Sequence, residues 1–153
     1  MIVKFKNNPE PGQNYIGMED TIKSKINIEG KEYEIELLDT LDEEQYLNLL
    51  DMWLNFGEGF ILIFDINNRE TFEYIKNLKE KRKKKAFDSM KKPIVLVGNK
   101  IILEDKREIS YNEAKKLADS WGAEYCETSS KENINCREPF ELLAKKILKC
   151  RKK

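Results

Sequence analysis

Two apolar runs decide the fold: residues 59–65 read GFILIFD and residues 93–99 read PIVLVGN. Both runs are continuous rather than alternating, which is typical of strands covered on both faces of a parallel sheet. Between them, residues 68–87 carry apolar side chains at helical spacing, beginning with Phe72. A strand, a helix and a second strand in this order predict a right-handed βαβ unit. The fold class is therefore α/β.

The residues before this unit predict further strands. Residues 2–5 (IVKF) are a candidate first strand. Residues 21–29 and 32–39 are two β-rich runs, and Glu29-Gly30 lies where the first gives way to the second. This arrangement predicts an antiparallel hairpin at the edge of the sheet.

The residues after the unit predict two helices with a short strand between them. Ser110, with Glu113 three residues later, forms a capping box ahead of a helical stripe that Gly122 closes. A short strand follows. Asn135 as the cap and Pro139 in the first turn then predict a terminal helix.

Composition narrows the function before any motif is considered. The 153 residues are 40% hydrophobic, so we expect residues 1–153 to form a single domain with an ordinary core. The 28 basic and 28 acidic side chains balance, which disfavours nucleic-acid binding. The lack of histidine excludes His-based catalysis and His-ligated metals.

The same survey points to the cytoplasm. No apolar run approaches the roughly 20 residues of a membrane span, and the N-terminus lacks the pattern of a secretory signal. Cys126, Cys136 and Cys150 are few and scattered, which predicts neither a disulfide framework nor a zinc site. Charged residues follow Cys150, so we expect no prenyl anchor.

Several short motifs occur in one order along the chain. They are Leu38-Asp39-Thr40, Gly57-Glu58-Gly59-Phe60, Asn67-Asn68, Val97-Gly98-Asn99-Lys100 and Glu127-Thr128-Ser129. With this order and spacing, the chain from about Tyr15 to its end resembles the small GTPases of the Ras superfamily, and most closely the Ras subfamily. The resemblance implies a Ras-like fold: a mostly parallel central sheet with an antiparallel edge hairpin and helices on both faces. It also implies binding of GDP or GTP with magnesium, and switch loops that protein effectors and regulators read.

The phosphate-binding part of that family is missing from the sequence. Such a loop needs the full string G-x-x-x-x-G-K-[S/T] to hold phosphates and magnesium, and no such string occurs here. The family places the loop and a first helix between the first strand and the hairpin, where residues 7–15 (NNPEPGQNY) stand instead. In the family topology the first strand runs antiparallel to the outer strand of the hairpin, so a short bridge can join them. Losing the helix would uncover part of one sheet face.

The first switch keeps its partner-facing residues. Gly17 stands where the family has a threonine on magnesium, and it has no ligand to give. Glu19 and Asp20 match the acidic pair that faces effectors, or are an exposed strand end without special meaning. With Tyr46 they make the surface that the resemblance assigns to protein partners.

The second switch keeps one metal-site residue. Asp39 matches the family's carboxylate that holds a magnesium-bound water. The alternative is that Asp39 is only a polar residue at the end of a strand. Asp42 and Glu43 replace the glycine and glutamine that serve the terminal phosphate and the attacking water. Two added carboxylates would repel a triphosphate. Although the family implies GTPase activity, these residues argue against hydrolysis, and we assign no catalytic residue.

The sequence retains some, but not all, of the residues of the family's guanine-recognition motifs. Asn99 and Lys100 match the family's N-K-x-D motif, but Ile102 stands in place of its aspartate, which would leave two guanine donors unpaired. Thr128 and Ser129 match the motif whose backbone contacts the base. The resemblance thus assigns nucleotide binding to these four matching residues, although Asn99 can equally serve to bridge loops of the fold.

Three functions stay open. In the first, the chain is a pseudo-GTPase that acts as a protein-interaction and signalling module and needs no cofactor. In the second, it is a Ras-like switch that binds GDP or GTP with magnesium, and its phosphate loop is absent only from this version of the sequence. In the third, it is a fragment without function. In the first two, the partners are protein effectors or regulators, and a second copy of the chain could cover the uncovered sheet face.

Overall fold

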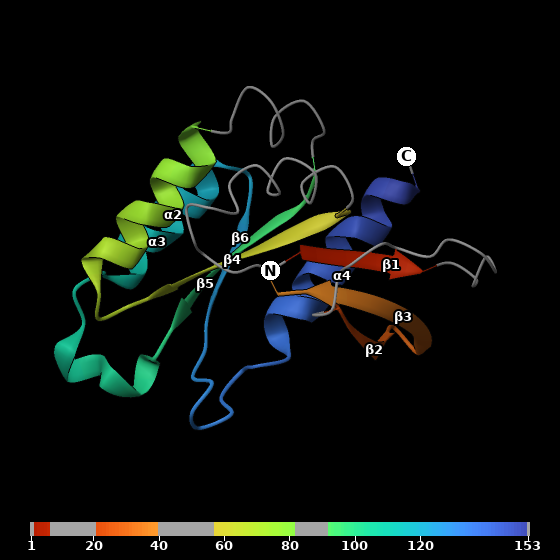
Figure 1. Ribbon diagram of the computed structural model, residues 1–153, viewed down its shortest axis with the longest axis horizontal. Helices are drawn as coiled ribbons and strands as arrows, with labels where there is room; N and C mark the ends of the chain where they lie inside the picture. The colour runs from red at the N-terminus through yellow and green to blue at the C-terminus, as the bar shows by residue number, and fades with distance from the viewer. Residues whose placement is uncertain (1, 7–20, 40–56, 82–91, 153) are drawn as a thin grey trace.

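The computed structural model describes residues 2–6, 21–39, 57–81 and 92–152 (Figure 1). These residues include a six-stranded sheet in the order β2-β3-β1-β4-β5-β6. The strands are β1 (Ile2–Lys6), β2 (Thr21–Ile28), β3 (Lys31–Leu38), β4 (Gly59–Asp65), β5 (Ile94–Asn99) and β6 (Glu124–Glu127). The helices are α2 (Arg69–Lys81), the short 3-10 helix η3 (Ile101–Lys106), α3 (Tyr111–Ser120) and α4 (Glu138–Arg151). The predicted α/β class is confirmed.

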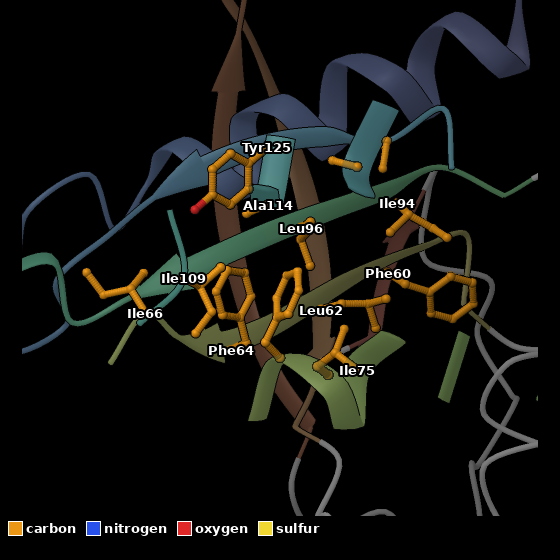
Figure 2. Close-up of a cluster of buried hydrophobic side chains, with 13 residues drawn as sticks. Phe60, Leu62, Phe64, Ile66, Ile75, Ile94, Leu96, Ile109, Ala114 and Tyr125 are labelled. Carbon is orange, nitrogen blue, oxygen red and sulfur yellow. The ribbon is translucent and has the colours of Figure 1, made fainter. Parts of the chain in front are cut away.

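Strands β4, β5 and β6 are parallel, and helices cover both of their faces. Phe60, Leu62 and Phe64 are buried on the face that α2 and α3 cover, as Figure 2 shows. On the opposite face, Ile61 packs with the buried side of α4, which lies across the sheet from α2 and α3 (Figure 1). Alternate residues of one strand therefore enter two separate cores, which explains why its sequence is apolar without interruption.

The hairpin forms as predicted. β2 and β3 pair antiparallel from Thr21↔Leu38 to Ile28↔Lys31. The two turn residues, Glu29 and Gly30, both have positive φ, at 53° and 81°, as a two-residue type I′ turn requires. The hairpin occupies one edge of the sheet, with β2 outermost.

The two predicted helix starts have different outcomes. Ser110 is confirmed as the cap of α3, because its side chain accepts a hydrogen bond of 3.1 Å from the Glu113 backbone N–H. The Glu113 carboxylate accepts from Arg69 instead of closing the capping box. The prediction of Asn135 as the cap of the terminal helix is wrong. The cap of α4 is Arg137, and Pro139 lies in the first turn, whereas Asn135 has a φ of 54° and donates its side-chain amide to the Glu127 carbonyl. Because its side chain bonds the end of β6, Asn135 does not cap α4.

The direction of β1 differs from the family topology. β1 pairs antiparallel with β3, from Ile2↔Leu38 to Lys6↔Glu34, and antiparallel with β4 at Ile2↔Phe60. Because β2 is also antiparallel to β3, β1 runs parallel to β2, and the expectation that these two strands oppose each other is wrong. The parallel part of the sheet is thus confined to β4–β6. The joining residues, where the sequence lacks the phosphate loop, lie outside the described part of the chain.

The face that α4 covers is covered incompletely. Ile22, opposite Leu37 on the hairpin, is 58% exposed, and Ile63 of β4 is 42% exposed. A cavity of about 330 Å³ lies between the hairpin and the first turn of α4, with Ile35 and Phe140 among its lining residues. The described residues therefore leave apolar surface open on this side of the sheet. None of the described helices is long and apolar enough to cross a membrane.

Candidate functional site

The candidate site lies where β4, β5 and β6 end. Because these strands are parallel, the residues that follow them meet at one edge of the sheet. Asp65 pairs with Asn99 in the register of β4 and β5, and the β5–β6 pairing ends at Gly98↔Glu127, just before Thr128. The structure thus brings the predicted nucleotide-binding residues together, as the resemblance requires.

The side-chain amide of Asn99 joins β5 to the loop after β6. Its Oδ1 accepts hydrogen bonds from the Thr128 hydroxyl at 3.2 Å, and from the Ser130 backbone N–H at 3.2 Å and hydroxyl at 3.3 Å. The Thr128 N–H donates to the Gly98 carbonyl, and the Ile101 N–H donates to the Thr128 carbonyl. Asn99 therefore bridges β5 and the loop after β6, which is the structural one of its two interpretations.

Lys100 is held in an unusual backbone conformation. Its φ and ψ are 69° and 35°, in the left-handed region, and they turn the chain from β5 into η3. Its Nζ lies 2.6 Å from Oδ2 of Asp65, at the end of the neighbouring strand. The lysine of the N-K-x-D motif thus has an acidic partner, which the sequence analysis missed because Asp65 belongs to an apolar strand run. The sequence signal that could have identified this partner is a charged residue at the end of a buried strand.

Ser129 and Ile102 complete the base side of the edge. Ser129 is buried, and its backbone exchanges two hydrogen bonds with Ile134. Ile102, in place of the family's aspartate, lies in η3 with 38% of its surface exposed. At the position where a carboxylate would accept from guanine, the chain therefore offers an apolar side chain.

A second polar network lies next to the site and is centred on Arg107. Arg107 donates to both carboxylate oxygens of Glu127 at 2.9 Å, and to both of Glu104 at 2.7 and 2.6 Å. These contacts, with Glu127 first and Glu104 second, raise the pKa of Arg107. Glu127 also accepts from the Tyr125 hydroxyl at 2.7 Å, and burial together with this contact raises the pKa of Tyr125. The network joins η3 to the end of β6, and the sequence analysis did not identify it.

Cys126, which precedes this network, is a core residue. Burial, and then the negative charges of Glu138 and Glu127, raise the pKa of its thiol to about 12. The thiol is therefore protonated at neutral pH and is a poor nucleophile. Cys126 therefore serves packing in the core on the α4 side of the sheet.

Among the described residues, the metal side of the site is not assembled. Asp39 is exposed just after β3. Leu38 and Phe60 both pair with Ile2, so Asp39 lies level with the start of β4, on the order of 13 Å along the strand direction from Asp65. Across the described ranges, no three acidic, cysteine or histidine side chains gather to hold a metal ion. These residues do not fit magnesium, whereas the base side keeps its arrangement.

One buried atom lacks a partner at this edge. Oδ1 of Asn67, in the turn after β4, is buried and accepts no hydrogen bond from any described residue. A buried acceptor without a donor costs about 1–3 kcal/mol. Oδ1 of Asn67 is therefore an unsatisfied acceptor among the described residues. The predicted partner-facing residues, Glu19, Asp20 and Tyr46, lie outside the described residues too.

Comparisons with known proteins agree with the geometry. The family model of the Ras family matches residues 1–149. The chain is 36% identical over 133 residues to Ras-related protein O-RAL of Diplobatis ommata, covering 84% of this chain and 65% of that protein. It is 35% identical over 128 residues to Ras-related protein ralB-A of Xenopus laevis, covering 84% and 62%. It is 35% identical over 133 residues to Ras-related protein Ral-B of Mus musculus, covering 84% and 65%.

The chain belongs to the Ras family. Its α/β sheet, the residues at the carboxyl edge of β4–β6 and the match over nearly its whole length agree on this point. The matched part spans a little under two thirds of the length of the relatives named above.

Proposed function

We propose that this Ras-family chain is a pseudo-GTPase, a protein-interaction and signalling module in which GTP binding and hydrolysis are lost or severely weakened. The observation that carries the proposal is the base edge of the sheet. Oδ1 of Asn99 accepts from Thr128 and Ser130, Lys100 contacts Asp65, and no described carboxylate is offered to guanine at Ile102. The absence of the full string G-x-x-x-x-G-K-[S/T] supports the same conclusion for the phosphates. On this proposal the protein needs no cofactor.

A thermal-shift titration with GDP and GTP, each with magnesium, tests the proposal. A ligand at 100 times its dissociation constant adds about 2.7 kcal/mol of stability, which raises Tm by about 5–11 °C in a domain of this length. We expect no shift at millimolar nucleotide. A magnesium-dependent shift would contradict the proposal and establish a phosphate site.

A pair of matched variants makes this test sharper. Ile102→Asp restores the carboxylate of the N-K-x-D motif, and Ile134→Asp places the same charge on a side chain of nearly equal exposure, 38% against 39%. If only the carboxylate were lost, Ile102→Asp alone would gain affinity for GDP. We expect neither variant to bind, because the phosphate side is missing as well.

The second candidate is a Ras-like switch that binds GDP or GTP with magnesium through a phosphate loop absent from this version of the sequence. The buried Oδ1 of Asn67 favours it, because that atom lacks a donor among the described residues. In that protein, Asn99, Lys100, Thr128 and Ser129 would bind the base and Asp39 a magnesium-bound water. Titration of a chain extended with the loop distinguishes the two candidates.

We propose protein effectors or regulators as the partners, in the cytoplasm, and Glu19, Asp20 and Tyr46 as the contact surface. Reversing both charges, in Glu19→Lys/Asp20→Lys, should abolish binding of proteins that the wild-type chain captures. Glu29→Lys, in the exposed hairpin turn, is the matched control. If every captured protein still binds the double variant, this surface is not the contact.

We also propose that a second copy of the chain covers the open sheet face. The support is apolar surface on the α4 side, at Ile22 and Ile63, and the cavity of about 330 Å³ that Leu37, opposite Ile22, helps to line. Sedimentation velocity over a range of concentrations should detect a dimer that Ile63→Lys dissociates. Lys145→Ile, on the exposed side of α4, is a control for nonspecific association. A monomer at all concentrations would refute this contact.

A further inference from the structure

The ion pair between Asp65 and Lys100 joins two strands and is partly buried, which distinguishes it from a simple surface ion pair. Its atoms lie 2.6 Å apart, and the two side chains are 23% and 49% exposed. Asp65 ends β4, and Lys100 follows β5, so the contact joins two neighbouring parallel strands at the edge where the candidate site lies. Among the described residues, Asp65 has this one partner for its carboxylate.

Lys100 is strained where it is held. A side chain in the left-handed region brings Cβ close to the following carbonyl oxygen, which glycine avoids. Strained conformations of this kind persist only where the surroundings hold them in place. Around Lys100 these are the bond from the Ile101 N–H to the Thr128 carbonyl, the bond from the Leu103 N–H to the Lys100 carbonyl, and the ion pair with Asp65.

The conformation of Lys100 decides the geometry of the whole edge. Asn99 precedes it, and the Asn99 Oδ1 holds Thr128 and Ser130. If Lys100 relaxed to an ordinary backbone conformation, the direction of η3 and the contact between Ile101 and Thr128 would both change. A carboxylate that anchors the lysine therefore controls both loops.

We infer that Asp65 is a positioning residue: its carboxylate holds Lys100 in the left-handed conformation and so keeps the β5 and β6 loops in their base-side arrangement without a ligand. This role concerns the same edge as the proposed function but requires no nucleotide. The outcome of a nucleotide titration therefore does not decide it.

Amide hydrogen exchange on the full chain tests the role. The reporters are the Ile101 amide, which donates to Thr128, and the Ser130 amide, which donates to Asn99. Asp65→Asn should speed exchange at both about threefold, the factor expected for losing a partly exposed ion pair. The Glu113 amide, bonded to the cap of α3, should not change.

A matched variant separates the role from a general loss of charge. Lys115 and Asp119 form an ion pair on the surface of α3, so Asp119→Asn removes a similar contact far from the edge. Asp119→Asn should leave the Ile101 and Ser130 amides unchanged. If Asp65→Asn and Asp119→Asn give the same exchange at these amides, the inference is overturned.

Changes at Lys100 test the mechanism. Lys100→Gly relieves the strain and removes the partner together, so Asp65→Asn should have no effect in that background. Lys100→Arg keeps the charge and should keep the protection of both amides. An equal effect of Asp65→Asn with lysine or glycine at position 100 would refute the role.

The wild-type chain gives a further test in case Asp65→Asn does not fold. About 1 M sodium chloride screens a partly exposed pair. Exchange at Ile101 and Ser130 should then rise more than exchange at Glu113. An equal change at the three amides in salt would also overturn the inference.

Discussion

Arg107 offers the sharpest test of how the site is supported. Its side chain and that of Glu127 are 15% and 16% exposed, and they share two hydrogen bonds of 2.9 Å. Arg107→Met keeps an unbranched apolar stem but leaves the Glu127 carboxylate without its counter-charge. Removing one partner of a buried ion pair costs about 3–5 kcal/mol. Because some exposure persists, we expect the low end, about 3 kcal/mol.

The assay is thermal unfolding followed by circular dichroism. For a chain of this length, about 3 kcal/mol corresponds to a fall in Tm of about 6–12 °C. Arg107→Met/Glu127→Gln should recover part of that loss, because the orphaned carboxylate is neutralised. Glu104→Gln, which alters the more exposed partner at 66% exposure, should lower Tm much less.

Two results would refute this reasoning. Arg107→Met could unfold within 2 °C of the wild-type protein, which would mean that the network is as weak as an exposed ion pair. Alternatively, the double variant could be as unstable as Arg107→Met alone. The lost stability would then come from packing of the arginine stem rather than from an unpaired charge.

Three further changes test other parts of the structure. Gly98→Ala would place a Cβ 2.6 Å from the Tyr125 hydroxyl oxygen, so we expect a loss of about 1–3 kcal/mol from overpacking, measured by urea unfolding. Ser110→Ala removes the cap of α3 and should cost about 1 kcal/mol in the same assay. The hydrogen bond from Arg69 lowers the pKa of Glu113, against the opposing effect of burial. Stability from this contact is therefore complete above about pH 4.5, the unfolded value, and is lost as the pH falls through the lower folded pKa. Glu113→Gln should flatten the curve of Tm against pH below about pH 4.5, and an unchanged curve would contradict the assignment.

The parts of the fold that sequence predicts well are those determined by local interactions. The run at Gly59–Asp65 predicts a strand with two largely buried faces, because its short, continuous apolar sequence is typical of a strand in a parallel sheet. Ser110 and Glu113 predict a helix start, because the capping hydrogen bond lies within four residues. In both cases the residues that determine the structure are close in the sequence.

The parts that sequence predicts poorly depend on contacts between distant segments. Asn135 has the composition of a helix cap, but its bond to Glu127 places it elsewhere. The direction of β1 depends on its pairing with β3 and β4, about which its own five residues say nothing. At the site, the motifs identify Asn99, but Asp65 is recognised only when β4 and β5 are seen side by side.

The central position of β1 bears on the order in which the chain can fold. Strands β4, β5 and β6 are joined through α2 and α3 in sequence order, so their contacts close short loops and can form early. β1 precedes both of its neighbours in the chain, yet Ile2 pairs with Leu38 and with Phe60. The strand must wait for the hairpin and for β4 before both of its edges are satisfied. The pairing of Ile2 with Phe60 spans more of the chain than any pairing within β4–β6, so we expect the joining of the hairpin to the parallel strands to be a late step of folding.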